Sequence, residues 1–166
     1  MKTALLHEYE GLRTFAVILA SGDEVMMTLT EFAAERQLKA TQLTAIGAFS
    51  RVVVAYFDWE TKDYRNVLID EQVEVLSRVG DITIDANTPK VHAHVVVGKA
   101  DATAHGGHLV KAHVRPTLEI VLMEMPRHLT ALRSRIGAQP DRSSIDVTVP
   151  STGRSVWTVR HGRQWT

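Results

Sequence analysis

Four histidines in the middle of the sequence have the residue type and spacing of metal ligands. His92 and His94 lie two residues apart in an apolar run, so an extended strand would place both imidazoles on one face, close enough to share an ion. His105 and His108 follow on either side of Gly106-Gly107, where we expect a tight turn that returns a third imidazole to that face. Three histidine ligands would leave a fourth zinc position open for water or another ligand.

The composition restricts which groups could bind such a metal. The chain has 166 residues, with eight histidines and no cysteine. Disulfides, thiolate zinc sites and cysteine nucleophiles are therefore excluded, and His, Asp and Glu remain as protein ligands for a transition metal. With eight histidines in the chain, one His-x-His pair can also arise by chance, so spacing alone leaves a purely structural role open.

The charge balance bears on the class of protein. Lys and Arg number 19, as do Asp and Glu, so the formal net charge is zero, which argues against a DNA-binding domain. The content of 45% hydrophobic and 23% charged residues is typical of a globular domain. No apolar run reaches the roughly 18 residues that span a bilayer, and Glu8 and Glu10 interrupt the N-terminal apolar stretch too early for a signal peptide. We therefore expect a cytoplasmic protein without membrane contact.

The elements around the histidines predict an α+β fold with a mainly antiparallel sheet and two helices. A buried strand is expected at 14–21. An amphipathic helix is expected at 29–37, after a capping box formed by Thr28 and Glu31. Residues 128–136 should form the second helix, which Gly137 ends. The remaining strands are expected at 43–50 and 52–59, joined or bent at Gly47, and at 64–69, 73–76, 82–84, 91–98, 109–114 and 118–125.

The C-terminal part of the chain differs from the rest in charge. Residues 139–166 carry four Arg and two Asp, a net charge of +2, whereas residues 1–138 carry 15 basic and 17 acidic residues. We expect residues 1–138 to form one domain and 139–166 a peripheral, positively charged extension, with an edge strand at Val147 or at 156–159.

Four charged residues in or beside the strand runs are further candidates for the site. Glu74 and Glu119 each lie between apolar neighbours. Each is either a solvated or interface charge, or a carboxylate that hydrogen-bonds to a metal ligand or acts as a general base. Arg78 and Arg115 are candidates to pair with these carboxylates or to hold an anionic ligand through the guanidinium fork, although each can equally form a plain salt bridge.

Several segments together resemble the PPC domain, which plants and prokaryotes share. The resemblance covers residues 13–135, and the His-x-His pair followed by Gly-Gly-His-Leu is its most specific part. The matching segments are 15–17, 45–50, 73–77 with 80–82, 91–94, 106–109 and 116–120.

The resemblance implies a trimeric α+β domain in which His92, His94 and His108 match zinc ligands near the subunit boundary. His105 matches no ligand position and is expected as a turn residue or as a partner of a ligand. Three residues after Leu109, where the family usually has glycine, this chain has Ala112 followed by His113.

Prokaryotic members also carry a DNA-binding label taken over from plant proteins with AT-hooks. This chain lacks that Arg-Gly-Arg-Pro segment; the nearest stretch, 161–164, lacks its first Arg and its Pro. The sequence therefore predicts a trimeric zinc protein with an open site in a subunit cleft and no assigned reaction. The alternative is a DNA-binding or transcription-associated protein without an AT-hook.

Overall fold

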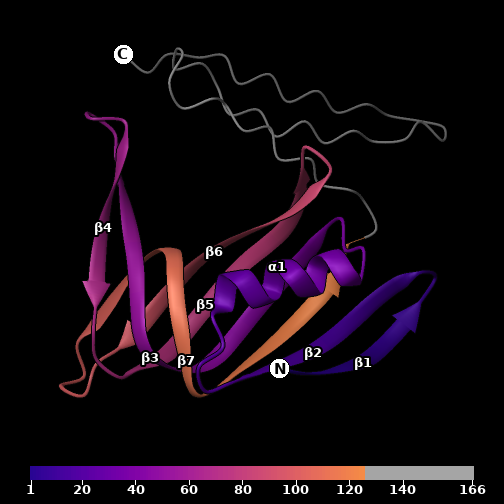
Figure 1. The fold of residues 1–166 in the computed structure, drawn as a ribbon, viewed down its shortest axis with the longest axis horizontal. Helices are drawn as coiled ribbons and strands as arrows, with labels where there is room; N and C mark the ends of the chain where they lie inside the picture. Colours follow the sequence, from indigo (N-terminus) through magenta and orange to yellow (C-terminus); the bar gives the residue numbers. More distant parts are fainter. Residues whose placement is uncertain (126–166) are drawn as a thin grey trace, which may run out of the picture.

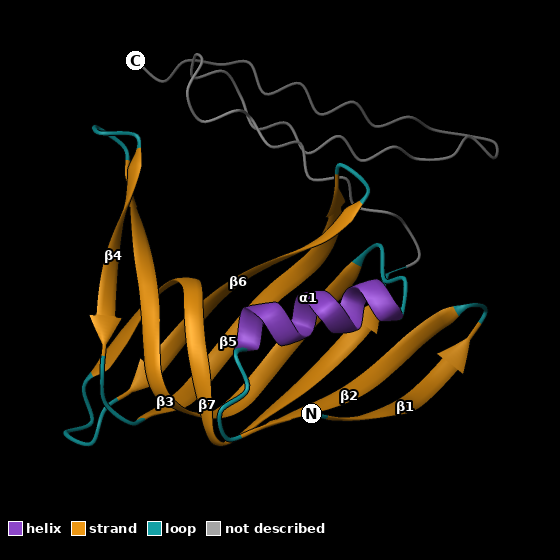
Figure 2. Cartoon of the chain, viewed as in Figure 1, coloured by secondary structure: helices purple, strands orange, loops and turns teal. Residues whose placement is uncertain are grey.

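The structure is a computed structural model and describes residues 1–125, in which seven strands and one helix are present (Figure 2). The elements are β1 (Lys2–Tyr9), β2 (Leu12–Ala20), α1 (Val25–Glu35), β3 (Thr41–Asp58), β4 (Asp63–Ile69), β5 (Val73–Asp85), β6 (Thr88–Gly98) and β7 (Ala104–Glu124). The second helix expected at 128–136 and the extension expected at 139–166 lie outside the described residues. Within residues 1–125, no helix is long and apolar enough to cross a membrane.

The strands form one antiparallel sheet in the order β1-β2-β7-β6-β5-β3-β4. β7 also pairs with β3, so the pairings of β3, β5, β6 and β7 close into a ring. α1 lies across one face of this sheet (Figure 1). The predicted α+β class with a mainly antiparallel sheet is confirmed.

The hydrophobic core lies between α1 and the sheet face that it covers. Leu29, Phe32 and Ala33 of the helix are buried against strand residues such as Val17, and the rings of Phe15 and Phe32 meet edge to face at 5.5 Å. Side chains at the alternate positions of the same strands point to the opposite side. We call this second side the open face; its exposed apolar residues are Ile18, Ile46, Leu76, Val79, Val96 and Val121.

α1 begins earlier than the sequence predicted. The expected capping box of Thr28 and Glu31 is wrong, because the Glu24 carboxylate caps the helix instead and accepts hydrogen bonds from the backbone amides of Met26 (3.3 Å) and Met27 (2.7 Å). The earlier start also buries Val25, so the apolar face of the helix is one turn longer than expected.

Four strand assignments also need correction. The strands expected at 73–76 and 82–84 are one continuous strand, β5. β1 was missed, because all eight of its residues are exposed and it shows no apolar alternation. β3 runs unbroken through Gly47, which has a φ of 144° at a register shift, so the expected pair of strands is a single one. β7 likewise continues through Pro116, where two strands were expected.

The tight turn expected at 105–108 is wrong. These residues belong to β7 and pair with β6, Val97 lying opposite His105 and His94 opposite His108. The chain turns earlier, where the Lys99 amide donates a 2.9 Å hydrogen bond to the Thr103 carbonyl and Ala102 adopts a φ of 64°.

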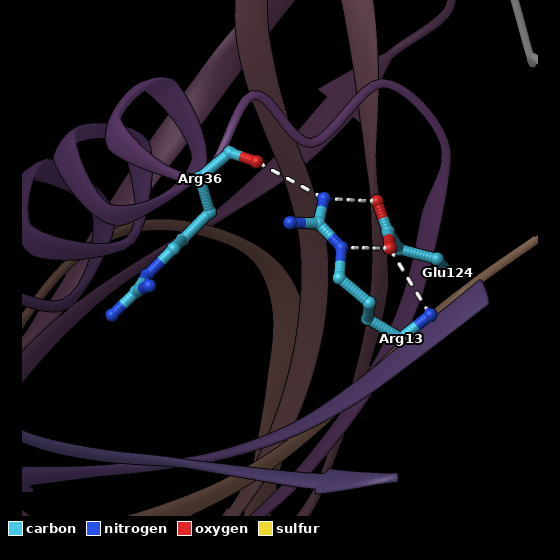
Figure 3. Close-up of polar contacts among 3 residues, drawn as sticks. All are labelled: Arg13, Arg36 and Glu124. Atoms are coloured by element: carbon cyan, nitrogen blue, oxygen red, sulfur yellow. Dashed lines mark hydrogen bonds and ion pairs between the residues drawn. The ribbon is translucent and has the colours of Figure 1, made fainter. Parts of the chain in front are cut away.

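An ion pair between β2 and β7, with an added hydrogen bond to the end of α1, joins the ends of these three elements. Arg13 of β2 donates from Nε (2.6 Å) and Nη2 (2.8 Å) to the two carboxylate oxygens of Glu124 at the end of β7 (Figure 3). The same Nη2 donates to the carbonyl of Arg36, just after α1, at 3.0 Å. The Glu124 carboxylate raises the pKa of Arg13. This two-pronged contact fixes the end of β7 relative to β2 and the helix.

Candidate metal centre

The structure brings His92, His94 and His108 together on the open face. His92 and His94 come from β6, and His108 of β7 lies directly opposite His94 in the sheet. The ring centroids are 5.4 Å apart for His92 and His94, 5.1 Å for His92 and His108, and 5.4 Å for His94 and His108. One ring nitrogen from each residue lies within 4.8 Å of the others. His92 and His94 are exposed and His108 is half-buried.

The alternation of β6 explains why the first two histidines share a face. Val91, Ala93 and Val95 are buried in the core, which turns the residues between them outward. This orientation depends on the packing of the apolar residues, so the fold itself places the His-x-His pair on the open face.

Gly106 and Gly107 allow β7 to approach its two neighbours closely at the site. A Cβ atom at Gly106 would lie 2.8 Å from the carbonyl oxygen of Val95, and one at Gly107 would lie 2.8 Å from that of Ala55. His108 follows at once and pairs with both His94 of β6 and Ala55 of β3. The glycines therefore serve close strand contact, not the turn that the sequence suggested.

The electrostatics of the site favour the neutral form of the His94 imidazole. Burial lowers the pKa of His94, and the neighbouring His92 lowers it further. Asp81 of β5 lies opposite His92 in the sheet; burial raises the pKa of its carboxyl, while the charge of His92 partly offsets this. Neutral imidazole is the form that binds a metal. Asp81 is the acidic neighbour of the triad that was not singled out from the sequence.

The donor set fits a borderline transition metal such as zinc. A tetrahedral ion with typical zinc–nitrogen bonds needs ring nitrogens about 3.4 Å apart, which small side-chain rotations can reach from the observed grouping. Three imidazoles also leave a coordination position open. Because His92 and His94 are exposed, that position can face the open side of the sheet.

The other sequence candidates lie apart from the triad. His105 is exposed, with its Nε2 3.5 Å from the Thr103 hydroxyl. Glu74 and Arg115 are exposed at other positions of β5 and β7. Glu119 is on the open face and lines a hollow of about 440 Å³ together with Ile46 and Val121. Among residues 1–125, none of these joins the grouping of potential ligands.

Arg78 is buried in the sheet and is also among the residues that line this hollow. Its side chain is 1% exposed, between the buried strand neighbours Ala45 and Val95. None of its three guanidinium nitrogens has a hydrogen-bond partner in the described part of the chain, so it pairs with neither Glu74 nor Glu119 there. Burial lowers the pKa of Arg78 to about 10, which leaves it charged at neutral pH.

An aromatic side chain from a distant hairpin touches the triad. The ring of Tyr64, on β4, lies 5.3 Å from that of His108 and is tilted by 36°. Phe57 of β3 is the cross-strand partner of Tyr64, at 5.1 Å. No local pattern in the sequence indicated that Tyr64 reaches the histidines.

The fold and sequence define the family. The sequence profile of the Plants and Prokaryotes Conserved (PCC) domain matches residues 6–126, and the chain belongs to this family. This is the family that the sequence resembles, called the PPC domain above. No curated protein matches the chain.

Solved structures agree with this assignment. A PPC protein of Pyrococcus horikoshii is 24% identical and has a TM-score of 0.70, with 82% of this chain and 91% of that chain covered. A metal-containing protein of Archaeoglobus fulgidus is 28% identical at a TM-score of 0.69, with 82% and 94% covered. A candidate DNA-binding protein of Bacteroides thetaiotaomicron is 22% identical at a TM-score of 0.69, with 78% and 89% covered.

Proposed function

We propose that this PPC-domain protein binds one zinc ion per subunit through His92, His94 and His108, with one coordination position left open. The observation that carries the proposal is the convergence of three imidazole nitrogens within 4.8 Å, from two strands, on an exposed surface. The metal-containing relative of Archaeoglobus fulgidus, 28% identical to this chain, supports it.

The surrounding residues suit such a site. Zinc would supply Lewis acidity at the open position. The Tyr64 ring packs against His108, and Asp81 is the cross-strand neighbour of His92. These contacts would hold two of the three ligands in place before an ion arrives.

Replacing His92 and His94 together by Ala should abolish zinc binding. Purified wild-type protein should contain close to one zinc per chain by elemental analysis, and the double variant close to none, because a single imidazole cannot hold the ion. His105→Ala is the matched control: it removes an exposed histidine of the same strand as His108 and should keep the zinc. A folded wild-type protein that stays metal-free after equilibration with zinc would contradict the proposal.

We also propose that the chain assembles as a homotrimer through the open face, so that the metal site lies near a subunit boundary. Ile46 is 61% exposed, Leu76 56% and Val79 52%, and they belong to one apolar surface with a hollow at its centre. A contiguous apolar patch of this kind is typical of an interaction surface. The residues of the triad extend the same surface.

The alternative function, DNA binding, is favoured by the candidate DNA-binding protein of Bacteroides thetaiotaomicron. The charge of the described domain argues against it. Residues 1–125 contain 12 Lys and Arg against 17 Asp and Glu, a net charge of −5. A surface of that sign repels the phosphate backbone, so the basic residues of 126–166 would have to carry any contact.

We expect the protein to show no strongly salt-dependent affinity for duplex DNA. Binding through phosphate contacts would weaken steeply between about 50 and 200 mM salt. A fluorescence anisotropy titration of the full chain over this range checks the expectation. Tight binding at low salt with a steep salt slope would establish the alternative, and removal of residues 139–166 would then show whether the extension is responsible.

A further inference from the structure

A continuous series of aromatic rings leads from the triad along the β3–β4 hairpin. Tyr64 contacts His108 at 5.3 Å, Phe57 contacts Tyr64 at 5.1 Å, and Trp59 contacts Phe57 at 6.0 Å. The Lys62 ammonium lies 3.2 Å from the centroid of the Trp59 ring. Figure 1 shows this hairpin standing away from the body of the sheet.

The hairpin turns these rings toward the triad. Ala55, opposite His108 in the sheet, lies two residues before Phe57 on β3, so both side chains project from the same side as His108. Tyr64 is the cross-strand partner of Phe57 and shares that side, whereas Tyr56 projects from the other. The open face and one side of the hairpin therefore form a single surface with the histidines at their junction.

These rings remain accessible in the subunit. Trp59 is 70% exposed and Tyr64 is 43% exposed, and Phe57 between them is half-buried. The edge-to-face angles of 61° and 70° keep the rings from stacking flat on one another. Exposed ring surface beside an open ligand position is available for a planar group.

The charge of the site indicates which group of such a ligand would bind the metal. Three neutral imidazoles leave the two positive charges of a divalent ion uncompensated. Asp81, the cross-strand partner of His92, is a nearby carboxylate, and it is not part of the ligand grouping. An anionic oxygen donor at the open position would balance this charge.

We propose that the site binds small ligands in which an anionic oxygen group is attached directly to an aromatic ring. The oxygen group would occupy the open coordination position, and the ring would pack against Tyr64 and Phe57. The inference rests on the proposed zinc site, because the metal anchors the oxygen group.

The test compares two metal-binding probes that differ in the ring. Cobalt(II) replaces zinc, and its visible absorption reports ligand binding without any assay of activity. Benzohydroxamate should bind the cobalt protein about tenfold more tightly than acetohydroxamate. In Tyr64→Leu the two affinities should come within about twofold of each other, since the aromatic contact is lost. Tyr56→Leu, which removes a ring from the other side of the same hairpin, should retain the tenfold preference.

The outcomes separate this inference from the proposed function. If cobalt and zinc bind but the wild type does not prefer the aromatic probe, or if Tyr64→Leu keeps the preference, the inference is overturned and the metal site stands. If no metal binds, both fail. If Tyr64→Leu itself loses the metal, Phe57→Leu replaces it, because Phe57 contacts Tyr64 and comes next in the series of rings; an unchanged preference there overturns the inference.

Discussion

Replacing Arg78 by Met should stabilise the protein by about 2–4 kcal/mol. The wild-type side chain is charged and 1% exposed, and its guanidinium nitrogens have no hydrogen-bond partner among residues 1–125. A buried charge without a partner loses its hydration free energy, and no hydrogen bond or ion pair offsets this loss. Met fills a similar volume with apolar atoms. Urea unfolding of both proteins at pH 7 measures the difference in the free energy of unfolding.

The pH dependence provides an independent check on Arg78. Burial lowers its pKa in the folded state to about 10, below the value in the unfolded chain. The unfolded state therefore holds the proton more tightly, and the penalty is present in full below pH 10 and declines as pH rises above it. The advantage of Arg78→Met should shrink over the same range. Arg115→Met, at an exposed position, should change stability by less than about 0.5 kcal/mol. A destabilised Arg78→Met would show that the guanidinium has a partner in solution.

Replacing Ile46 by Glu should convert the proposed trimer into a monomer. Ile46 lies on the open face beside the hollow and directly opposite Glu119, so a second carboxylate there would add like-charge repulsion to the cost of desolvating it in an interface. Light scattering after gel filtration should give about three times 18.5 kDa for the wild type and 18.5 kDa for the variant.

The matched control for Ile46→Glu is Met27→Glu. Met27 is 57% exposed on α1, which lies on the opposite side of the sheet, so the variant should stay trimeric. Dissociation of Met27→Glu would place the interface on the helix side. A wild-type protein that is monomeric at micromolar concentration would rule out the trimer.

The alternation of buried and exposed residues made most of the sheet predictable. Val91 to Val97 reads as a strand because its buried residues recur at every second position, and the same period places His92 and His94 on one side. β1 gave no such signal, because none of its residues is buried. The start of α1 was misplaced because Glu24 is a less usual cap than Thr28, although its carboxylate reaches two backbone amides.

Contacts across the sheet could not be read from spacing. The place of His108 came from the family resemblance, while its local structure was predicted as a turn because paired glycines are typical of turns. Their actual role, close approach to Val95 and Ala55, depends on strands that are distant in the sequence. Tyr64 and Asp81 reach the triad only through the registers of β4 with β3 and of β5 with β6, which no local pattern specifies.

The 21-residue length of β7 has a consequence for how this protein can change during evolution. One uninterrupted strand carries His108 near its start and the Arg13-bound Glu124 at its end, with β2, β3 and β6 all paired along it. A single-residue insertion or deletion between these points would turn His108 toward the core or pull Glu124 away from Arg13. Length variation should therefore collect at the Lys99–Thr103 turn and at the tip of the β3–β4 hairpin, where aromatic residues can be gained or lost without moving the three histidines.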